Sequence, residues 1–308
     1  MSALAAIAAQ HAPRPPAGIV VARAAAGEPP DVACAGPVEA GAVFELGSVT
    51  KAVTGLLLAD AVGRGEVALE TTLDAVFAGA PALALVDLAT HTAGLPRVPL
   101  ALLRRVGFTN LTDPYARTTV DELLSDLGRV RLRRPGRHRY SNVGAALLGQ
   151  ALAARAGAPY EELVHARVLG PLGVTEVWAR DAPPVVQPHD RRGRPVPPWE
   201  LGAYAPAGCL RGTARGLLSL ATACLAPPAE MADAVALALR PHARGRLLEP
   251  GLGWLRAPAG REHKMWWHNG GTHGCRSFVG LVPETGVAAA AVTNGSRSVD
   301  AAGRVALV

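Results

Sequence analysis

The sequence has 308 residues, of which 49% are hydrophobic and 18% are charged. A chain of this length and composition can bury a large apolar core, which excludes an intrinsically disordered protein. Its net charge of +6 is moderate, and no run of lysine and arginine is long enough, or sufficiently interleaved with aromatic residues, to indicate a nucleic-acid surface. No stretch approaches the roughly 18 apolar residues of a membrane span, so we expect neither nucleic acid nor a membrane as a partner.

The spacing of cysteine and histidine gives no sign of a metal site. The four cysteines are far apart and include no Cys-x-x-Cys pair: Cys34, Cys209, Cys224 and Cys275. This spacing disfavours a zinc cluster and favours buried free thiols. Three histidines near the C-terminus lack the His-Glu-x-x-His pattern of a metal-binding helix, namely His263, His268 and His273. We therefore expect no metal and no other cofactor.

The N-terminal region is predicted to form one helix and three strands. Alanine-rich residues 2–12 indicate a helix that ends where prolines begin, at Pro13. Its apolar run is too short for the hydrophobic part of a signal peptide and has no basic residue before it, so we expect a cytoplasmic protein. Glycine and proline turn signals separate the three strands, which we place at residues 18–22, 31–35 and 43–46.

The next helix opens with a Ser-x-x-Lys pattern, Ser48 to Lys51, and Gly63 ends it. A serine in the first turn of a helix lies beside free backbone N–H groups and the positive end of the helix dipole, which favour a developing anion. A lysine three residues later lies on the same face and can reach the hydroxyl. The pattern is short, and a helix cap followed by a solvated lysine is its ordinary explanation.

The use of lysine at position 51 favours a chemical role. The chain contains two lysines, Lys51 and Lys264, while arginine supplies its other basic side chains. Arginine stays charged in proteins, whereas a buried lysine can lose its proton. A composition that avoids lysine has therefore kept one in an otherwise apolar helix.

The middle of the chain, from about residue 71 to 200, is helical and rich in loops. Further helices are predicted from residue 121 and from Tyr140-Ser141-Asn142 onward. Between them, residues 129–139 hold six arginines and His138. A solvated face is the ordinary explanation, and a patch that steers an anionic substrate is the alternative.

The last third returns to strands. Two helices and three strands are expected, and Pro283 to Gly286 provide a hairpin turn between the last two strands. These elements are a helix over 213–225, strands over 264–268, 275–282 and 287–294, and a short helix from about residue 300. Trp266 and Trp267 alternate along the first of these strands, which predicts one in the core and one beside a pocket.

Strands at both ends around a helical middle predict an α/β (α+β) fold, with an antiparallel sheet flanked by helices and a mostly helical insertion. We expect a single domain with two parts. The α/β part comprises about residues 1–73 and 201–308, and the helical part about 74–200. The segment 183–198, dense in proline and arginine, is expected to be a surface loop.

Three short motifs stand in order along the chain: Ser48-x-x-Lys51, Tyr140-Ser141-Asn142 and His268-Asn269-Gly270-Gly271. Each is common alone, but their joint order, spacing and predicted context resemble the class C β-lactamase family, which also contains DD-peptidases, esterases and D-aminopeptidases. The resemblance covers nearly the whole chain, least well at 182–200 and at the C-terminus. It implies a β-lactamase/transpeptidase-like fold and a serine hydrolase that forms an acyl-enzyme with a small ester, amide or peptide-like substrate.

The resemblance also implies catalytic roles for the first two motifs. Ser48 would be the acylated nucleophile, and Lys51 and Tyr140 would take its proton and return one to the leaving group. Either of the two could be the primary base. Free tyrosine has a pKa near 10, so Tyr140 could serve only if a nearby cation lowered that value. Asn142 would hydrogen-bond the acyl side-chain amide of a substrate and could orient Lys51.

The third motif would bind substrate, with Gly270 leaving the strand edge open for close approach and the backbone N–H groups of Ser48 and Gly271 forming an oxyanion hole. It departs from the β-lactamase form, which has lysine where this chain has His268. Histidine is only partly charged near neutral pH, so it attracts a substrate carboxylate less strongly. We therefore rank esterase or peptidase-like activity above β-lactam turnover. Acyl transfer to an amine or alcohol, as in a transpeptidase, and a catalytically silent binding protein are the alternatives.

Overall fold

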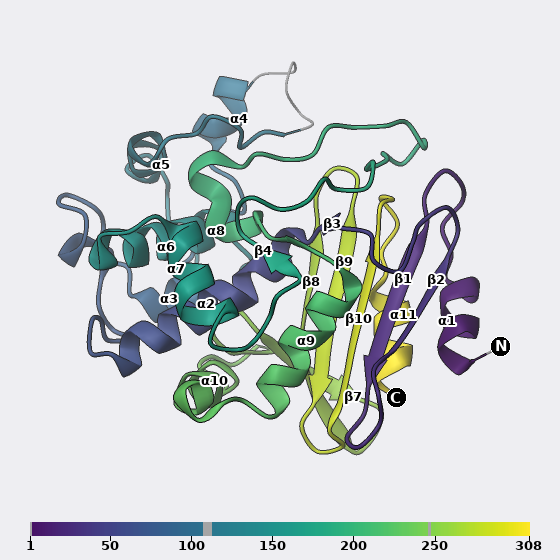
Figure 1. Cartoon of the computed structure of the whole chain (residues 1–308). Helices are drawn as coiled ribbons and strands as arrows, with labels where there is room; N and C mark the ends of the chain where they lie inside the picture. Colours follow the sequence, from purple (N-terminus) through teal and green to yellow (C-terminus); the bar gives the residue numbers. More distant parts are fainter. Residues whose placement is uncertain (1, 107–112, 246–247) are drawn as a thin grey trace.

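The computed structural model describes residues 2–106, 113–245 and 248–308. A seven-stranded sheet and the helices packed on it form one side of the molecule, and a mostly helical region lies beside it (Figure 1). Every neighbouring pair in this sheet is antiparallel, which confirms the predicted fold class. In spatial order the strands are β2 (Asp31–Ala35), β1 (Ile19–Ala24), β10 (Val287–Thr293), β9 (Arg276–Val282), β8 (His263–Gly271), β7 (Leu255–Ala259) and β6 (Glu249–Pro250).

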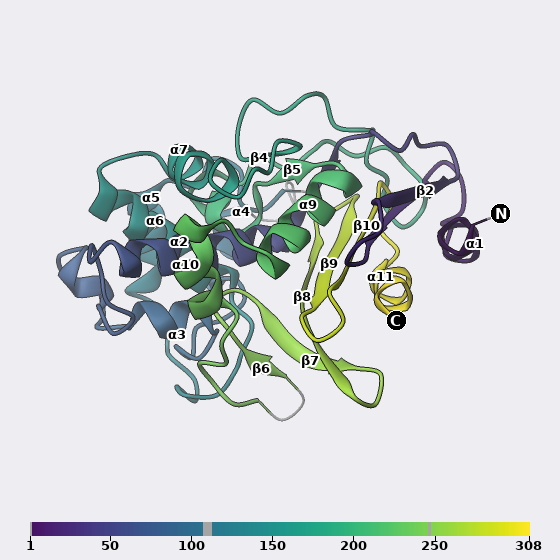
Figure 2. The ribbon, with the colours of Figure 1, turned by 60° about the horizontal axis from the view of Figure 1, so that its bottom comes forward.

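Both faces of the main sheet are covered by helices. Helix α9 (Ala214–Leu225) packs against β1, β9 and β10 on one face, while α11 (Asp300–Leu307) packs against the same strands on the other. Helix α1 (Ala3–Gln10) lies beside α11 and β2, as Figure 2 shows. Because helices cover both faces of the sheet here, β10 is buried at every position, and its sequence is almost entirely apolar.

The remaining helices lie in one region with the buried helix α2 (Thr50–Gly63), in which every residue from 50 to 61 is buried. Those helices are α3 (Leu85–Ala89), α4 (Leu100–Val106), α5 (Val120–Leu127), α6 (Asn142–Ala156), α7 (Tyr160–Val164), α8 (Ala205–Gly208) and α10 (Ala232–Ala238). A small second sheet joins this region to the chain around residue 210. Its strands, in order, are β3 (Phe44–Glu45), β5 (Arg211–Gly212) and β4 (Val177–Trp178).

No single helix among the described residues is long and apolar enough to cross a membrane. The segments Ala214–Leu225 and Ala229–Ala238 reach that length and composition only together, across a bend of 81°.

Three local expectations need correction. Ser48 does not open helix α2 but lies in a one-turn 3₁₀ segment, Gly47–Val49, just before it. Trp266 and Trp267 point to opposite faces of β8, yet both are buried, one in each of the two cores that flank the sheet. Cys34 is exposed because it lies on the edge strand β2, and all four cysteines are free thiols.

Close packing of α2 against the chain before β7 gives a first prediction. A Cβ atom added at Gly55 would lie 1.8 Å from the carbonyl oxygen of Leu252, whereas one added at Gly63 meets nothing within 4 Å. We expect Gly55→Ala to destabilise the protein by about 1–3 kcal/mol through overpacking, despite the better helix propensity of alanine. Thermal unfolding of the two variants checks this, because Gly63→Ala should be neutral or stabilising by about 0.5–1 kcal/mol. Equal melting temperatures would contradict the proposed packing.

Candidate active site

The structure brings the first two motifs together around one hydroxyl. Tyr140, just before α6, donates a hydrogen bond from its hydroxyl to Ser48 Oγ at 2.6 Å. The amine of Lys51, on the first turn of α2, donates to the same oxygen at 3.0 Å. Ser48 and Tyr140 line a cleft of about 540 Å³. A hydroxyl, an amine and a phenol therefore meet within hydrogen-bonding distance at the wall of an open cavity.

Glycines allow the Ser48 turn to pack directly on the end of strand β8. Gly47 adopts φ +51°, and a Cβ there would lie 2.7 Å from the backbone nitrogen of Gly271. A Cβ at Gly270 would lie 1.9 Å from the carbonyl oxygen of Leu46. That same oxygen accepts a hydrogen bond from the Ser277 hydroxyl of β9 at 2.6 Å. The turn is thereby fixed to the sheet, and residues 48 and 271 both line the cleft.

Lys51 is almost completely buried, with 2% of its surface exposed. Its amine also donates to the carbonyl oxygen of Ala207 at 2.6 Å, and these described hydrogen bonds do not include the expected one to Asn142. Burial lowers the pKa of Lys51 well below its usual value, and the positive charge of Arg97 lowers it further. No carboxylate pairs with this amine among the described residues. The environment therefore favours a neutral lysine.

The environment of Tyr140 favours its protonated form. Burial of its hydroxyl raises its pKa to about 12, and the hydrogen bond to Ser48 and the charge of Arg97 offset this only in part. The amine of Lys51 lies 5.0 Å, and the guanidinium of Arg97 5.5 Å, from the centre of the tyrosine ring. The ring of His91 packs against it at 4.7 Å. These contacts hold the phenol in place beside Ser48.

Asn142 faces a second, smaller cavity of about 50 Å³ that also reaches Ser48. Its side-chain nitrogen donates to the Tyr115 hydroxyl at 2.8 Å, and its buried oxygen has no hydrogen-bond partner among the described residues. Tyr115 is edge-on to Trp199, with ring centres 5.6 Å apart, and lies 4.6 Å from the ring of Tyr204. Three aromatic rings thus line this small cavity, and the Asn142 side-chain oxygen is a hydrogen-bond acceptor without a partner among the described residues.

The third motif is divided between the cleft and the core. Asn269, Gly270 and Gly271 line the cleft. His268 is only 2% exposed and is not among the residues that line it, because alternate residues of β8 point to opposite faces. Burial lowers the pKa of His268 to about 3. The expectation that His268 contacts substrate therefore needs correction, since a buried neutral ring offers no charge to a carboxylate.

The cationic groups of the cleft come from positions that no motif marks. Arg97 and Arg276 both line it. Arg276 donates to the carbonyl oxygens of Thr272 and Cys275, at 2.6 Å each. Asp300 supplies an acidic group, which accepts a hydrogen bond from the Asn269 side chain at 2.7 Å. Arginine is abundant throughout this sequence, so its identity alone gave no signal for these two positions.

A buried carboxylate fixes the loop that carries Trp199. Glu45, on β3, accepts a hydrogen bond from the Trp199 backbone nitrogen at 2.6 Å and from the Thr272 hydroxyl at 2.9 Å. Burial raises the pKa of Glu45, and these hydrogen bonds offset part of the increase. The loop before residue 200 is thus tied to the end of β8, which places Trp199 between the cleft and the small cavity.

Within residues 2–106, 113–245 and 248–308, no group of three or more His, Cys, Asp and Glu side chains is arranged to hold a metal ion.

Comparison with known proteins identifies the family. A family model described as Beta-lactamase matches residues 17–308. The chain belongs to the beta-lactamase family. In sequence it is similar to a protein named Beta-lactamase from Escherichia coli K12, with 30% identity over 168 residues, and to the D-alanyl-D-alanine-carboxypeptidase/endopeptidase AmpH of that organism, with 29% over 152 residues. These matches cover 50% and 46% of this chain but only 39% and 38% of the relatives.

Solved structures of the beta-lactamase family share the fold. A class C beta lactamase from Rhodobacter sphaeroides superimposes with a TM-score of 0.80 at 22% identity, covering 94% of this chain and 92% of the other. A beta-lactamase/D-alanine carboxypeptidase from Pseudomonas syringae gives 0.79 at 18% identity, covering 91% and 89%. At these identities the likeness establishes the architecture.

The buried amine of Lys51 makes stability depend on pH in a predictable direction. Between its lowered pKa in the folded protein and its ordinary value of 10.5, the unfolded chain binds a proton that the folded chain does not, so folding becomes more favourable as pH rises. Lys51→Met removes this penalty. We expect its melting temperature to exceed that of the unmodified protein by about 2–4 °C at neutral pH, with the difference shrinking toward pH 10.

The other lysine provides the control. Lys264 is exposed and pairs with Glu249 at 3.0 Å, so Lys264→Met should change the melting temperature little and show no such trend. A Lys51→Met variant less stable than the unmodified protein at every pH would show that the amine is held in its charged form.

Proposed function

We propose that the protein is a serine hydrolase that cleaves a small ester or amide through an acyl-enzyme at Ser48. The observation that carries this proposal is the pair of hydrogen bonds to Ser48 Oγ, from Tyr140 at 2.6 Å and from Lys51 at 3.0 Å. A nucleophile within reach of a base, in a cleft with room for a substrate, is the arrangement that covalent catalysis requires.

The pKa directions favour one order of proton transfers. When Lys51 is neutral, its nitrogen has a lone pair, and the 3.0 Å contact allows it to accept the proton of Ser48 as the Ser48 oxygen bonds to the substrate carbonyl carbon. When the bond to the leaving group breaks, that group takes a proton from the Tyr140 hydroxyl, and the Lys51 ammonium restores it. Water then attacks the acyl-enzyme in the reverse sequence and releases the acid. A base and an acid positioned in this way are worth about 10²–10⁴ in rate.

The backbone N–H groups of Ser48 and Gly271 are proposed to stabilise the oxyanion that forms during both steps. Support comes from the contact between the Gly47 turn and the end of β8, which brings these two residues to the same cleft. Such donors cost no reorganisation during the reaction, and losing one typically slows the reaction about 10²–10³-fold.

The small cavity beside Asn142 is proposed to bind the acyl part of the substrate. Its volume of about 50 Å³ favours a short acyl group over a bulky one. Because the Asn142 nitrogen is engaged by Tyr115, its free oxygen favours an acyl group that carries an N–H or O–H donor. An ester or amide of a short, polar acid fits this cavity better than the large acyl side chains of many β-lactams.

Peptide-like substrates are the second candidate. The relative AmpH is named a carboxypeptidase/endopeptidase, and Arg97 and Arg276 beside Ser48 could pair with a terminal carboxylate in place of His268. Acyl transfer shares every step up to acylation and differs only in whether an amine or alcohol replaces water. Product analysis with added acceptors separates transfer from hydrolysis.

Covalent labelling tests the proposed nucleophile. We expect a fluorophosphonate to add one adduct mass to the intact protein, and Ser48→Ala to abolish it. Tyr140→Phe should retain the fold but slow labelling about 10²-fold or more. Intact-mass spectrometry reads both results, with Ser141→Ala as the control for a neighbouring serine. Absence of an adduct with fluorophosphonate and with penicillin would favour a binding protein without catalysis.

Chain-length dependence tests the acyl cavity. With p-nitrophenyl esters we expect kcat/KM to fall at least tenfold from acetate to octanoate, since the cavity excludes the longer chain. Trp199→Phe enlarges the cavity and should reduce this preference several-fold. The control, Trp178→Phe, alters a tryptophan of β4 that lines neither cavity beside Ser48. An unchanged preference in Trp199→Phe would place the acyl group elsewhere.

A further inference from the structure

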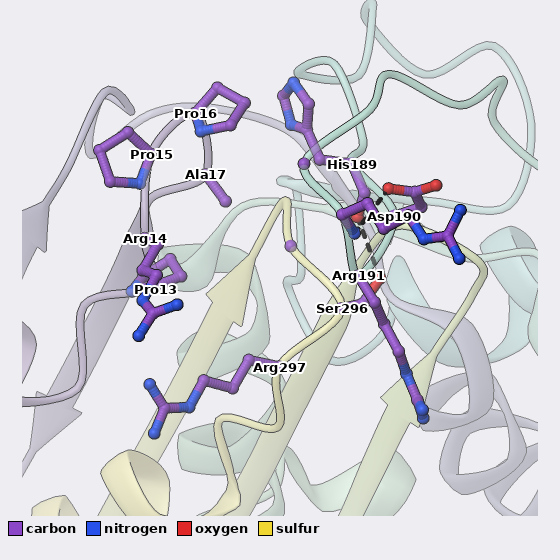
Figure 3. Close-up of a pocket in the computed structure, with 13 residues that line it drawn as sticks. Pro13, Arg14, Pro15, Pro16, Ala17, His189, Asp190, Arg191, Ser296 and Arg297 are labelled. Atoms are coloured by element: carbon purple, nitrogen blue, oxygen red, sulfur yellow. Dashed lines mark hydrogen bonds between the residues drawn. The ribbon is translucent and has the colours of Figure 1, made fainter.

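A second large cavity lies at the same end of the sheet as the cleft but does not include Ser48. It has a volume of about 690 Å³. Figure 3 shows its three walls, which come from distant parts of the sequence. They are the proline-rich segment 13–17 before β1, the turn 189–193, and residues 295–297 after β10. None of the residues of the three motifs lines it.

Hydrogen bonds at and next to the lining residues join the walls of this cavity. Asn294 is 2% exposed, and its side chain accepts a hydrogen bond from the Gly18 nitrogen at 2.8 Å and donates to the Gln187 carbonyl oxygen at 2.9 Å. Its carbonyl oxygen accepts from the His189 nitrogen at 2.9 Å. The Ser296 hydroxyl donates to the His189 carbonyl oxygen at 3.0 Å. These bonds tie all three walls together, so the shape of the cavity is fixed.

The lining is strongly cationic. It contains four arginines and a single acidic residue, Asp190. That carboxylate is already engaged, because it accepts hydrogen bonds from the backbone nitrogens of residues 192 and 194 and from the Arg194 side chain, and these bonds lower its pKa to about 2. Among the described residues no carboxylate forms an ion pair with the arginines that line the cavity, which are Arg14, Arg191, Arg192 and Arg297.

The arginines are spread over different walls. In Figure 3 the side chains of Arg14 and Arg297 extend on one side of the cavity, while that of Arg191 runs to the other side, away from the prolines. Burial lowers the pKa of Arg276 in the cleft, and the positive charge of Arg191 lowers it further. Arg297 is followed directly by Ser298, which lines that cleft. The arginine cavity therefore adjoins the cleft without sharing its residues.

We propose that this arginine cavity is a binding site for a polyanion, a ligand with two or more phosphate or carboxylate groups. Guanidinium groups match the planar, bidentate geometry of both anions. Like charges held on separate walls of a rigid cavity repel one another until an anion lies between them. A ligand with several charges can reach more than one wall, whereas a single small anion cannot. The proline wall offers a flat apolar surface for the body of such a ligand.

Calorimetry with tripolyphosphate and with citrate tests this proposal and separates phosphate from carboxylate ligands. We expect at least one of them to bind the full-length protein at low salt, and more weakly as salt rises. The double variant Arg14→Gln/Arg297→Gln should bind more weakly, with a dissociation constant raised about tenfold or more. Arg191 and Arg192 are unchanged in this variant. The two side chains that are changed are exposed, so the fold should be retained.

The control is Arg215→Gln/Arg261→Gln, which removes the same charge from exposed positions outside the cavity. It should bind like the unmodified protein. Equal weakening in both double variants would mean that overall charge attracts the anion, and unchanged affinity in the first would place the anion elsewhere, for example at Arg97 and Arg276. Either result, or no binding by the unmodified protein at low salt, overturns the proposal. Labelling of Ser48 is a separate measurement, so the proposed hydrolase can fail or succeed independently.

Discussion

The contact between the turn at Gly47 and the end of strand β8 is the constraint on which the site depends. Two backbones approach so closely that a Cβ at either Gly47 or Gly270 would overlap the other segment. The contact joins the sheet to the buried helix α2, and it sets Ser48 beside Gly271. Once this turn is fixed, the amine of Lys51 can reach the Ser48 hydroxyl only because α2 continues from it without a break.

Charge within the site is arranged around that buried amine. Arg97 lowers the pKa of Lys51 and also opposes the rise in the pKa of Tyr140. One cation therefore shifts both groups toward the deprotonated state. The β-lactamase form of the third motif has a lysine where this chain has His268, and a neutral histidine cannot supply that charge. Here Arg97 and Arg276, which lie on loops and at the start of β9, provide the positive charge of the cleft.

Sequence patterns predicted the parts of the fold that are set locally. The strands β1, β2 and β10, the glycine end of α2 and the opening of α6 at Asn142 follow from apolar period, turn residues and capping. The meeting of Ser48, Lys51 and Tyr140 was predicted from three motifs, and the hydrogen bonds to Ser48 agree with it. Elements with little local signal were missed, such as α10 and the edge pair β6 and β7, which is interrupted by proline.

Features that depend on distant contacts could not be predicted in this way. The burial of His268 follows from which face of β8 meets the core, and a short motif does not contain that information. The position of Trp199 depends on a hydrogen bond to Glu45, more than 150 residues earlier in the chain. Likewise Tyr115 matters only because its hydroxyl meets Asn142. In each case the residue can be read from the sequence, but the neighbour that it meets in the fold cannot.

The loop from 182 to 200 has the least resemblance to the family, yet it contributes to both cavities whose ligands are proposed. It carries Trp199 against the acyl cavity and His189 to Gly193 along the arginine cavity. Glu45 and Asn294 anchor its two ends to the sheet through buried hydrogen bonds. A rigid scaffold can retain the Ser48 chemistry while such an anchored loop varies, because changes in the loop alter the walls of the cavities and leave the reacting atoms in place. Substitutions in this loop are therefore expected to alter which ligands this chain accepts while leaving Ser48, Lys51 and Tyr140 in place.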